Sequence, residues 1–143
     1  MNVTVAKSAG FCFGVKRAID TVYQEIEKGE KVFTLGPIIH NEQVVQELEE
    51  KGVQVINSIE ELADIKDGTV VIRSHGVSEQ VIRQLEKYDI KIVDATCPFV
   101  SKIHRIVQEK YREGFQIVII GNRTHPEVEG INGWCENSAI VLE

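Results

Sequence analysis

Thr-Val-Val-Ile-Arg-Ser-His-Gly, residues 69–76, is the stretch of the sequence that decides the fold. Residues 69–72 are a short apolar run with β-branched side chains, which is typical of a strand buried on both faces of a parallel sheet. The run leads directly into a loop that carries His75, and Ser78 stands where it would cap a following helix. A strand, a loop and a helix in this order are the repeating parts of βαβ units.

The same alternation continues outward in both directions along the chain. Strands are expected at residues 3–6, 31–35, 53–56, 69–72, 91–93, 116–120 and 139–142. Helices are expected at residues 14–28, 42–51, from a capping box at 58–61 to about 63, after Ser78, from Pro98 to Gly114, and briefly from Glu127. Strands separated by helices of this length predict an α/β layered fold with a parallel sheet. No segment resembles a linker, and the boundary between two units is expected between Asp94 and Pro98.

The composition excludes several classes of protein. The 143 residues carry a formal charge of −6 and no run of Lys or Arg, so we expect no nucleic-acid partner. No apolar run reaches the roughly 18 residues that a membrane span needs. Residues 1–5 do not have the pattern of a signal peptide, and a cytoplasmic location is expected. Three widely spaced cysteines in such a chain do not form a disulfide framework.

Three of the four histidines follow predicted strands. His40 comes after the strand at 31–35, His75 after the strand at 69–72, and His125 after the strand at 116–120. Because ligands bind beyond the carboxyl ends of parallel strands, we expect these histidines to gather at one edge of the sheet. His104 lies inside a predicted helix and is expected to be a surface or boundary residue.

Two of the three cysteines also lie between a strand and a helix. Cys12 and Cys97 each stand at or near a predicted helix N-terminus, where the helix dipole favours a thiolate. Their spacing does not suit a zinc ribbon, but two thiolates on separate loops suit a cluster seated between structural units. Cys135 follows no strand and is interpreted as a structural or incidental thiol.

Five motifs together resemble the family of 4-hydroxy-3-methylbut-2-enyl diphosphate reductases, iron–sulfur enzymes of the non-mevalonate isoprenoid pathway. They are Ala-Gly-Phe-Cys-Phe-Gly-Val-Lys-Arg-Ala (9–18), Thr-Leu-Gly-Pro-Ile-Ile-His-Asn (34–41), Arg-Ser-His-Gly (73–76), Val-Asp-Ala-Thr-Cys-Pro (93–98) and Thr-His-Pro-Glu (124–127). Their order makes the resemblance specific, and it covers the whole chain. It implies three similar parallel-sheet, three-layer α/β units around a central cluster. Residues 1–96 would be the first unit, and 97–143 the first part of a second.

The resemblance also implies roles for individual residues. Cys12 and Cys97 would be ligands of a [4Fe–4S] cluster, with the third cysteine in a part of the enzyme that this chain does not contain. The substrate's diphosphate would contact His40, His75 and His125, with Thr124 nearby. Glu127 would deliver a proton to the departing hydroxyl group, because water leaves carbon readily only when that oxygen is protonated. The implied electron donor is a ferredoxin or flavodoxin.

The implied reaction is the reductive dehydroxylation of an allylic diphosphate to isopentenyl and dimethylallyl diphosphates, which makes the family oxidoreductases acting on CH or CH2 groups. Two alternatives remain open at this point. Three histidines with Glu127 as base also suit a mononuclear metal hydrolase, although this leaves Cys12 and Cys97 unexplained. The chain alone is also compatible with a folded, non-catalytic fragment, because its set of cluster ligands is incomplete.

Overall fold

A computed structural model describes residues 1–65 and 67–143, and its larger part is a four-stranded parallel sheet. The strands are β1 (Val32–Leu35), β2 (Gln54–Ile56), β3 (Thr69–Ile72) and β4 (Lys91–Asp94), in the order β2-β1-β3-β4. In the centre, Val32 to Leu35 pair in register with Thr69 to Ile72. The carboxyl ends of β1 and β3 therefore lie side by side, which places the loops that follow them next to each other.

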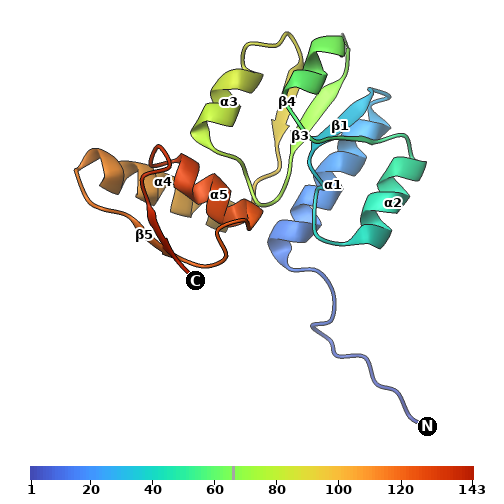
Figure 1. The fold of residues 1–143 in the computed structure, drawn as a ribbon. Helices are drawn as coiled ribbons and strands as arrows, with labels where there is room; N and C mark the ends of the chain where they lie inside the picture. Colours follow the sequence, from blue (N-terminus) through green and yellow to red (C-terminus); the bar gives the residue numbers. More distant parts are fainter. Residues whose placement is uncertain (66) are drawn as a thin grey trace.

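Helices cover both faces of this sheet (Figure 1). One face packs against α1 (Phe13–Glu27) and α2 (Glu42–Glu50), and the other against η1 (Glu60–Asp64), a 3₁₀ helix, and α3 (Glu79–Leu85). Side chains alternate between the two cores, so that Val71 joins the first while Val70 and Ile72 join the second. The expected three-layer α/β fold is confirmed for this part of the chain.

A buried ion-pair network fixes α1 against the beginning of β4. Glu25 is almost fully buried and accepts hydrogen bonds from Lys28 at 2.6 Å and Lys91 at 2.7 Å. These two bonds, the one from Lys28 being the stronger influence, lower the pKa of the Glu25 carboxyl. The network therefore holds the last turn of α1 against the first residue of β4.

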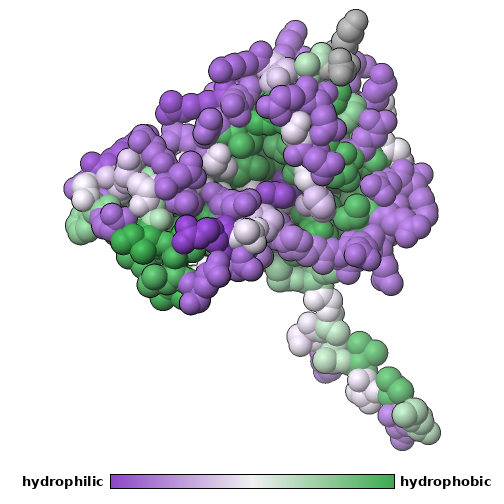
Figure 2. Space-filling view, viewed as in Figure 1, coloured by the Kyte–Doolittle hydropathy of each residue, from purple (hydrophilic) through white to green (hydrophobic). Residues whose placement is uncertain are grey.

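The remaining elements form a second, smaller unit. It consists of α4 (Pro98–Arg112), β5 (Val118–Ile120), α5 (Pro126–Gly133) and β6 (Ile140–Leu142), with β5 and β6 paired in parallel. Val118, Ile120, Ile140 and Leu142 are all exposed. Figure 2 shows hydrophobic residues gathered on the surface at this end of the molecule. β5, which consists only of Val and Ile, is therefore the least covered strand among the described residues.

One predicted strand is absent from the described residues, and one predicted capping box forms only in part. Residues 3–6 form no strand; they belong to an exposed segment that leads away from the rest of the chain (Figure 1), because no neighbouring strand lies beside them. The capping box at 58–61 forms only in part. The carboxylate of Glu61 accepts from the backbone N–H of Ser58 at 2.9 Å, but the first turn is a 3₁₀ helix without a side-chain cap.

Among the described residues, none of the helices combines the length and the hydrophobicity that a bilayer-spanning helix needs.

Candidate functional site

Three histidine rings meet where the two units join. The ring centroids of His40 and His75 are 4.4 Å apart, and His125 lies 5.7 Å from the first and 6.0 Å from the second. His40 follows β1, His75 follows β3, and His125 lies between β5 and α5. The gathering expected from the strand ends is therefore present, although one of the three strands belongs to the smaller sheet.

The local charges and burial keep His75 neutral. Its pKa is lowered to about 4, first by burial and then by the positive charges of His40, Arg73 and His125. The Nδ1 atom of His75 is buried and has no hydrogen-bond partner among the described residues. A neutral imidazole offers one N–H donor and one acceptor nitrogen, so His75 is suited to hydrogen-bond an oxygen-rich ligand.

His125 connects this group to the beginning of α5. Its Nδ1 accepts a hydrogen bond from the backbone N–H of Glu127 at 3.2 Å, which caps the helix. In the neutral ring the proton is then on Nε2, which is free to donate. Glu127 is half-buried in the first helical turn, and Thr124 hydrogen-bonds the side chain of Asn122 at 2.8 Å. Glu127 and Thr124 thus stand close to His125 in the chain, at the beginning of α5 and just before it.

The two cysteines that precede helices lie at neighbouring helix N-termini. Cys12 directly precedes α1 and Cys97 directly precedes α4, and neither thiol caps its helix. Gly14 in α1 packs against Cys97 so closely that a Cβ at position 14 would lie 2.5 Å from Sγ. Arg17 strengthens the junction by donating to the backbone oxygen of Thr96 at 3.0 Å. The helix N-termini that carry the two cysteines therefore meet at one joint.

The cysteine joint and the histidine group are directly connected. The backbone N–H of Cys97 donates to the carbonyl oxygen of Ser74 at 2.9 Å, and Ser74 is the neighbour of His75. A displacement of the Cys97 loop would therefore be transmitted to His75. Thiols and histidines belong to one connected set of strand-end loops.

The two cysteines at the joint are compatible, as a type of ligand, with an iron–sulfur cluster. Two unpartnered thiols are the ligand type that iron–sulfur clusters need, and Gly14 leaves room for the Cys97 sulfur beside α1. Within residues 1–65 and 67–143, no three His, Cys, Asp or Glu side chains are grouped to hold one metal ion.

His104 corrects one sequence prediction. It is not a surface or boundary residue, because only 4% of it is exposed, and its ring stacks on Trp134 at 5.3 Å. Burial lowers its pKa to about 4. The signal was its spacing: His104 follows Val100 by four residues and precedes Val107 by three, which places it on the buried face of α4. It packs beneath Gly76, where a Cβ would come within 2.7 Å of its Cε1 atom.

Cys135 is separate from the site. Its side chain is fully buried, and its thiol donates to the carbonyl oxygen of Asn132 at 3.2 Å. The structural interpretation from the sequence therefore agrees with its surroundings.

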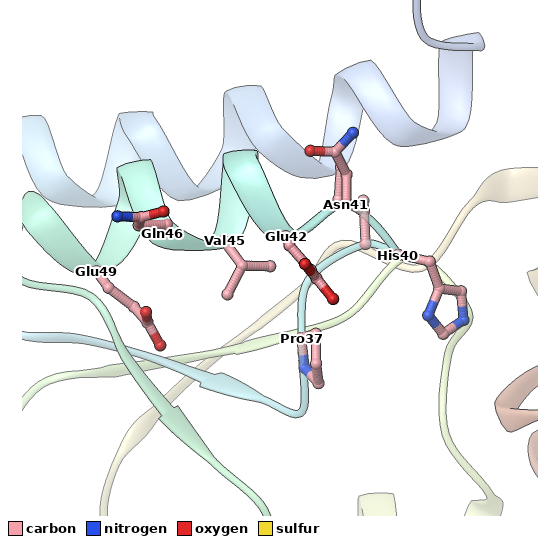
Figure 3. Close-up of a pocket in the computed structure, with 8 residues that line it drawn as sticks. Pro37, His40, Asn41, Glu42, Val45, Gln46 and Glu49 are labelled. Carbon is pink, nitrogen blue, oxygen red and sulfur yellow. The ribbon is translucent and has the colours of Figure 1, made fainter.

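An open pocket extends from His40 along α2. Its volume is about 720 Å³, and Figure 3 shows that it runs from Glu49 past Val45 and Glu42 to His40. Asn41 stands between His40 and the helix and caps it, by accepting from the N–H of Val44 at 3.0 Å. This cap fixes the position from which His40 projects.

Comparison with known proteins agrees with this arrangement. Residues 3–143 match the family described as LytB protein. The chain is 49% identical to the 4-hydroxy-3-methylbut-2-enyl diphosphate reductase of Clostridioides difficile (strain 630), across 100% of this chain and 51% of the relative. It is 53% identical to the reductase of the same name from Thermoanaerobacter sp. (strain X514), across 99% of this chain and 50% of the relative.

Solved structures give the same result. The reductase from Plasmodium falciparum superposes with a TM-score of 0.88 at 34% identity, covering 96% of this chain and 43% of that one. A structure of (E)-4-hydroxy-3-methyl-but-2-enyl diphosphate reductase, described as the terminal enzyme of the non-mevalonate pathway, superposes with a TM-score of 0.80 at 42% identity, covering 99% of this chain and 50% of that one. The chain spans about half the length of the relatives that it matches. It belongs to the LytB protein family.

Proposed function

We propose that this chain forms part of a 4-hydroxy-3-methylbut-2-enyl diphosphate reductase, which removes the hydroxyl group of its allylic substrate reductively. The observation that carries the proposal is the connection of three clustered histidines to two helix-terminal thiols through the hydrogen bond from Cys97 to Ser74. Named relatives from two bacteria and two solved structures support the same activity.

The histidine group would bind the diphosphate. His75 offers a neutral donor in a half-buried position, His125 presents Nε2, and His40 lies at the open side next to the pocket along α2. Diphosphate oxygens accept several hydrogen bonds, so donors from three different loops would hold the group in one orientation. Thr124, beside His125, would add a hydroxyl donor to the same group.

Cys12 and Cys97 would hold a [4Fe–4S] cluster, with a third cysteine from outside this chain. When bound, such a cluster supplies electrons and an open iron that acts as a Lewis acid. The residues of this chain would hold the substrate in position. Glu127 would hold the proton that the departing hydroxyl oxygen needs, because its place in the first turn of α5 is two residues from His125.

The proposal extends to partners, location and organisation. Electrons would come from a ferredoxin or flavodoxin, and the enzyme would work in the cytoplasm. Residues 1–96 would form the first unit and residues 97–143 the beginning of the second, which is supported by the two separate sheets. Since the chain offers two thiols at the joint, we propose that the 143-residue polypeptide alone does not turn over.

A chimera tests the proposal. This chain would replace the matching half of the Clostridioides difficile relative, and the protein would be purified without oxygen. About four iron and four sulfide per chain are expected, together with turnover of the allylic diphosphate. Cys97→Ser should remove most of the iron, whereas Cys135→Ser, the matched control, should retain it. About one zinc per chain without sulfide would overturn the cluster and favour the hydrolase.

A further inference from the structure

Arg73 lies at the centre of the three loops that carry the histidines. Its own loop carries His75. Its guanidinium packs over Gly36, the residue that follows β1, so that a Cβ there would lie 2.7 Å from Nη1. The same arginine lines a small cavity with Pro126 and Glu129, in the first turn of α5. The Arg73 side chain therefore packs against Gly36, from which the chain continues to His40. Its own loop carries His75, and it faces the beginning of α5, the helix that His125 caps.

The positive charge of the Arg73 guanidinium has few partners in this position. Its Nε atom is buried and has no hydrogen-bond partner among residues 1–65 and 67–143. Glu129 is near enough to act on Arg73 electrostatically, but the two form no ion pair within 4.0 Å among the described residues. Arginine remains protonated even when buried. Arg73 is half-buried, and a cation in this position without a full partner is less favourable than one in water, so a nearby anion would relieve it.

Gly36 shows that the chain is built around this arginine. Its φ of +70° lies in the left-handed region, and its missing side chain leaves the space that Nη1 occupies. The charge of Arg73 also reaches the histidine group, because it is one of the positive charges that act on His75. The position of the Arg73 charge therefore depends on the backbone at the end of β1, where Gly36 lies, and at the end of β3, which Arg73 follows.

We propose that Arg73 is a positioning residue of the diphosphate site, which supplies a fixed positive charge behind His40, His75 and His125 and holds their loops together. This rests on the proposed function. With this charge in place, the site attracts a diphosphate, and the histidine rings donate hydrogen bonds to it. The guanidinium acts through the loops and its electric field, and no direct contact with the ligand is required.

The test measures binding of inorganic pyrophosphate to the 143-residue chain by calorimetry, at low salt and at about 150 mM salt. Arg73→Met keeps the apolar stem and removes the charge, and it should weaken binding about tenfold or more at low salt. Its binding should also depend less on salt than that of the wild type. Arg73→Lys keeps the charge and should stay within about threefold. Arg83→Met is the matched control, because Arg83 is exposed in α3 and pairs with Glu79.

Each other outcome overturns the inference in a recognisable way. If Arg73→Met binds like the wild type while His40→Ala loses binding, Arg73 has no role and the histidine site stands. If the lysine and methionine variants are equally weak and both unfold more easily, the role is structural only. If the wild type does not bind pyrophosphate but the chimera holds iron and turns over, the inference fails while the reductase proposal survives.

Discussion

Strands β3 and β5 deliver equivalent histidine loops from very different surroundings. Each is an apolar strand, and the residue before the loop is Ile72 in β3 and Ile120 in β5. Ile72 is 1% exposed, whereas Ile120 is 83% exposed. The sheet that contains β3 is covered by helices on both faces, while the pair β5 and β6 leaves apolar side chains open. The site is therefore supported by one firm sheet and one open sheet.

The comparison shows that His125 owes its position to helix packing more than to its strand. Trp134, at the end of α5, donates from Nε1 to the carbonyl oxygen of Val77 at 2.9 Å. Gly133 lets α5 approach Ser78, at the beginning of α3, closely, and Gly130 faces the backbone of residues 75 and 76 at ordinary contact distance. This seam, formed by Gly130, Gly133 and Trp134 against residues 76–78, ties the smaller unit to the larger one.

The largest expected effect comes from the same substitution in the two strands. Ile72→Ala removes fully buried methyl groups and should lower the free energy of unfolding by about 2–5 kcal/mol. Ile120→Ala removes exposed atoms and should change it by less than about 0.5 kcal/mol. Urea titration of both variants provides the measurement. Equal losses of free energy of unfolding in the two variants would show that β5 is buried in solution, and would contradict the difference between the two strands.

A second prediction concerns pH and the buried His104 of the smaller unit. Its pKa is lowered from 6.5 to about 4, so the unfolded chain binds this proton more readily than the folded chain. The stabilising contribution of neutral His104 should be fully present above about pH 6.5. As the pH drops toward 4, the free energy of unfolding should fall by about 3 kcal/mol.

His104→Phe keeps an aromatic ring against Trp134 and removes the titration. The free energy of unfolding, measured by urea titration from pH 7 to pH 4, should therefore fall less steeply in this variant. The contribution of His75, which has the same sign, remains. An unchanged slope would mean that His104 is accessible to protons in the folded chain.

The smallest expected effect sharpens the role of the seam. A Cβ at Gly133 would overlap the Cβ of Ser78, so Gly133→Ala should destabilise the chain by about 1–3 kcal/mol and move α5 away from the histidine group. Gly130→Ala is the matched control, because the nearest atom to its Cβ would be 3.6 Å away. Magnetic resonance of the ring protons of His125 would report the displacement. Equal behaviour of the two variants would argue against a tight seam.

Much of this arrangement could be predicted from local patterns. Apolar runs, caps and glycines located nearly all the helices and strands, and the rule for strand ends brought the histidines together. Three features depend on packing between distant segments. Residues 3–6 have strand-forming side chains but no neighbour to pair with, His104 is buried by Trp134, and β5 is apolar but uncovered. Arg73 was also overlooked, because only the fold places Gly36 beneath its guanidinium.

The strand order has a consequence for how the polypeptide is made. All pairings of the larger sheet lie between residues 32 and 94, and β1, its first strand, pairs with both β2 and β3. Domains form from the N-terminus as the ribosome releases the chain. The layered unit with His40 and His75 thus has all its strands before α4 is translated. We therefore expect the layered unit to begin folding before His125 joins it, so that the site is assembled in the order of the chain.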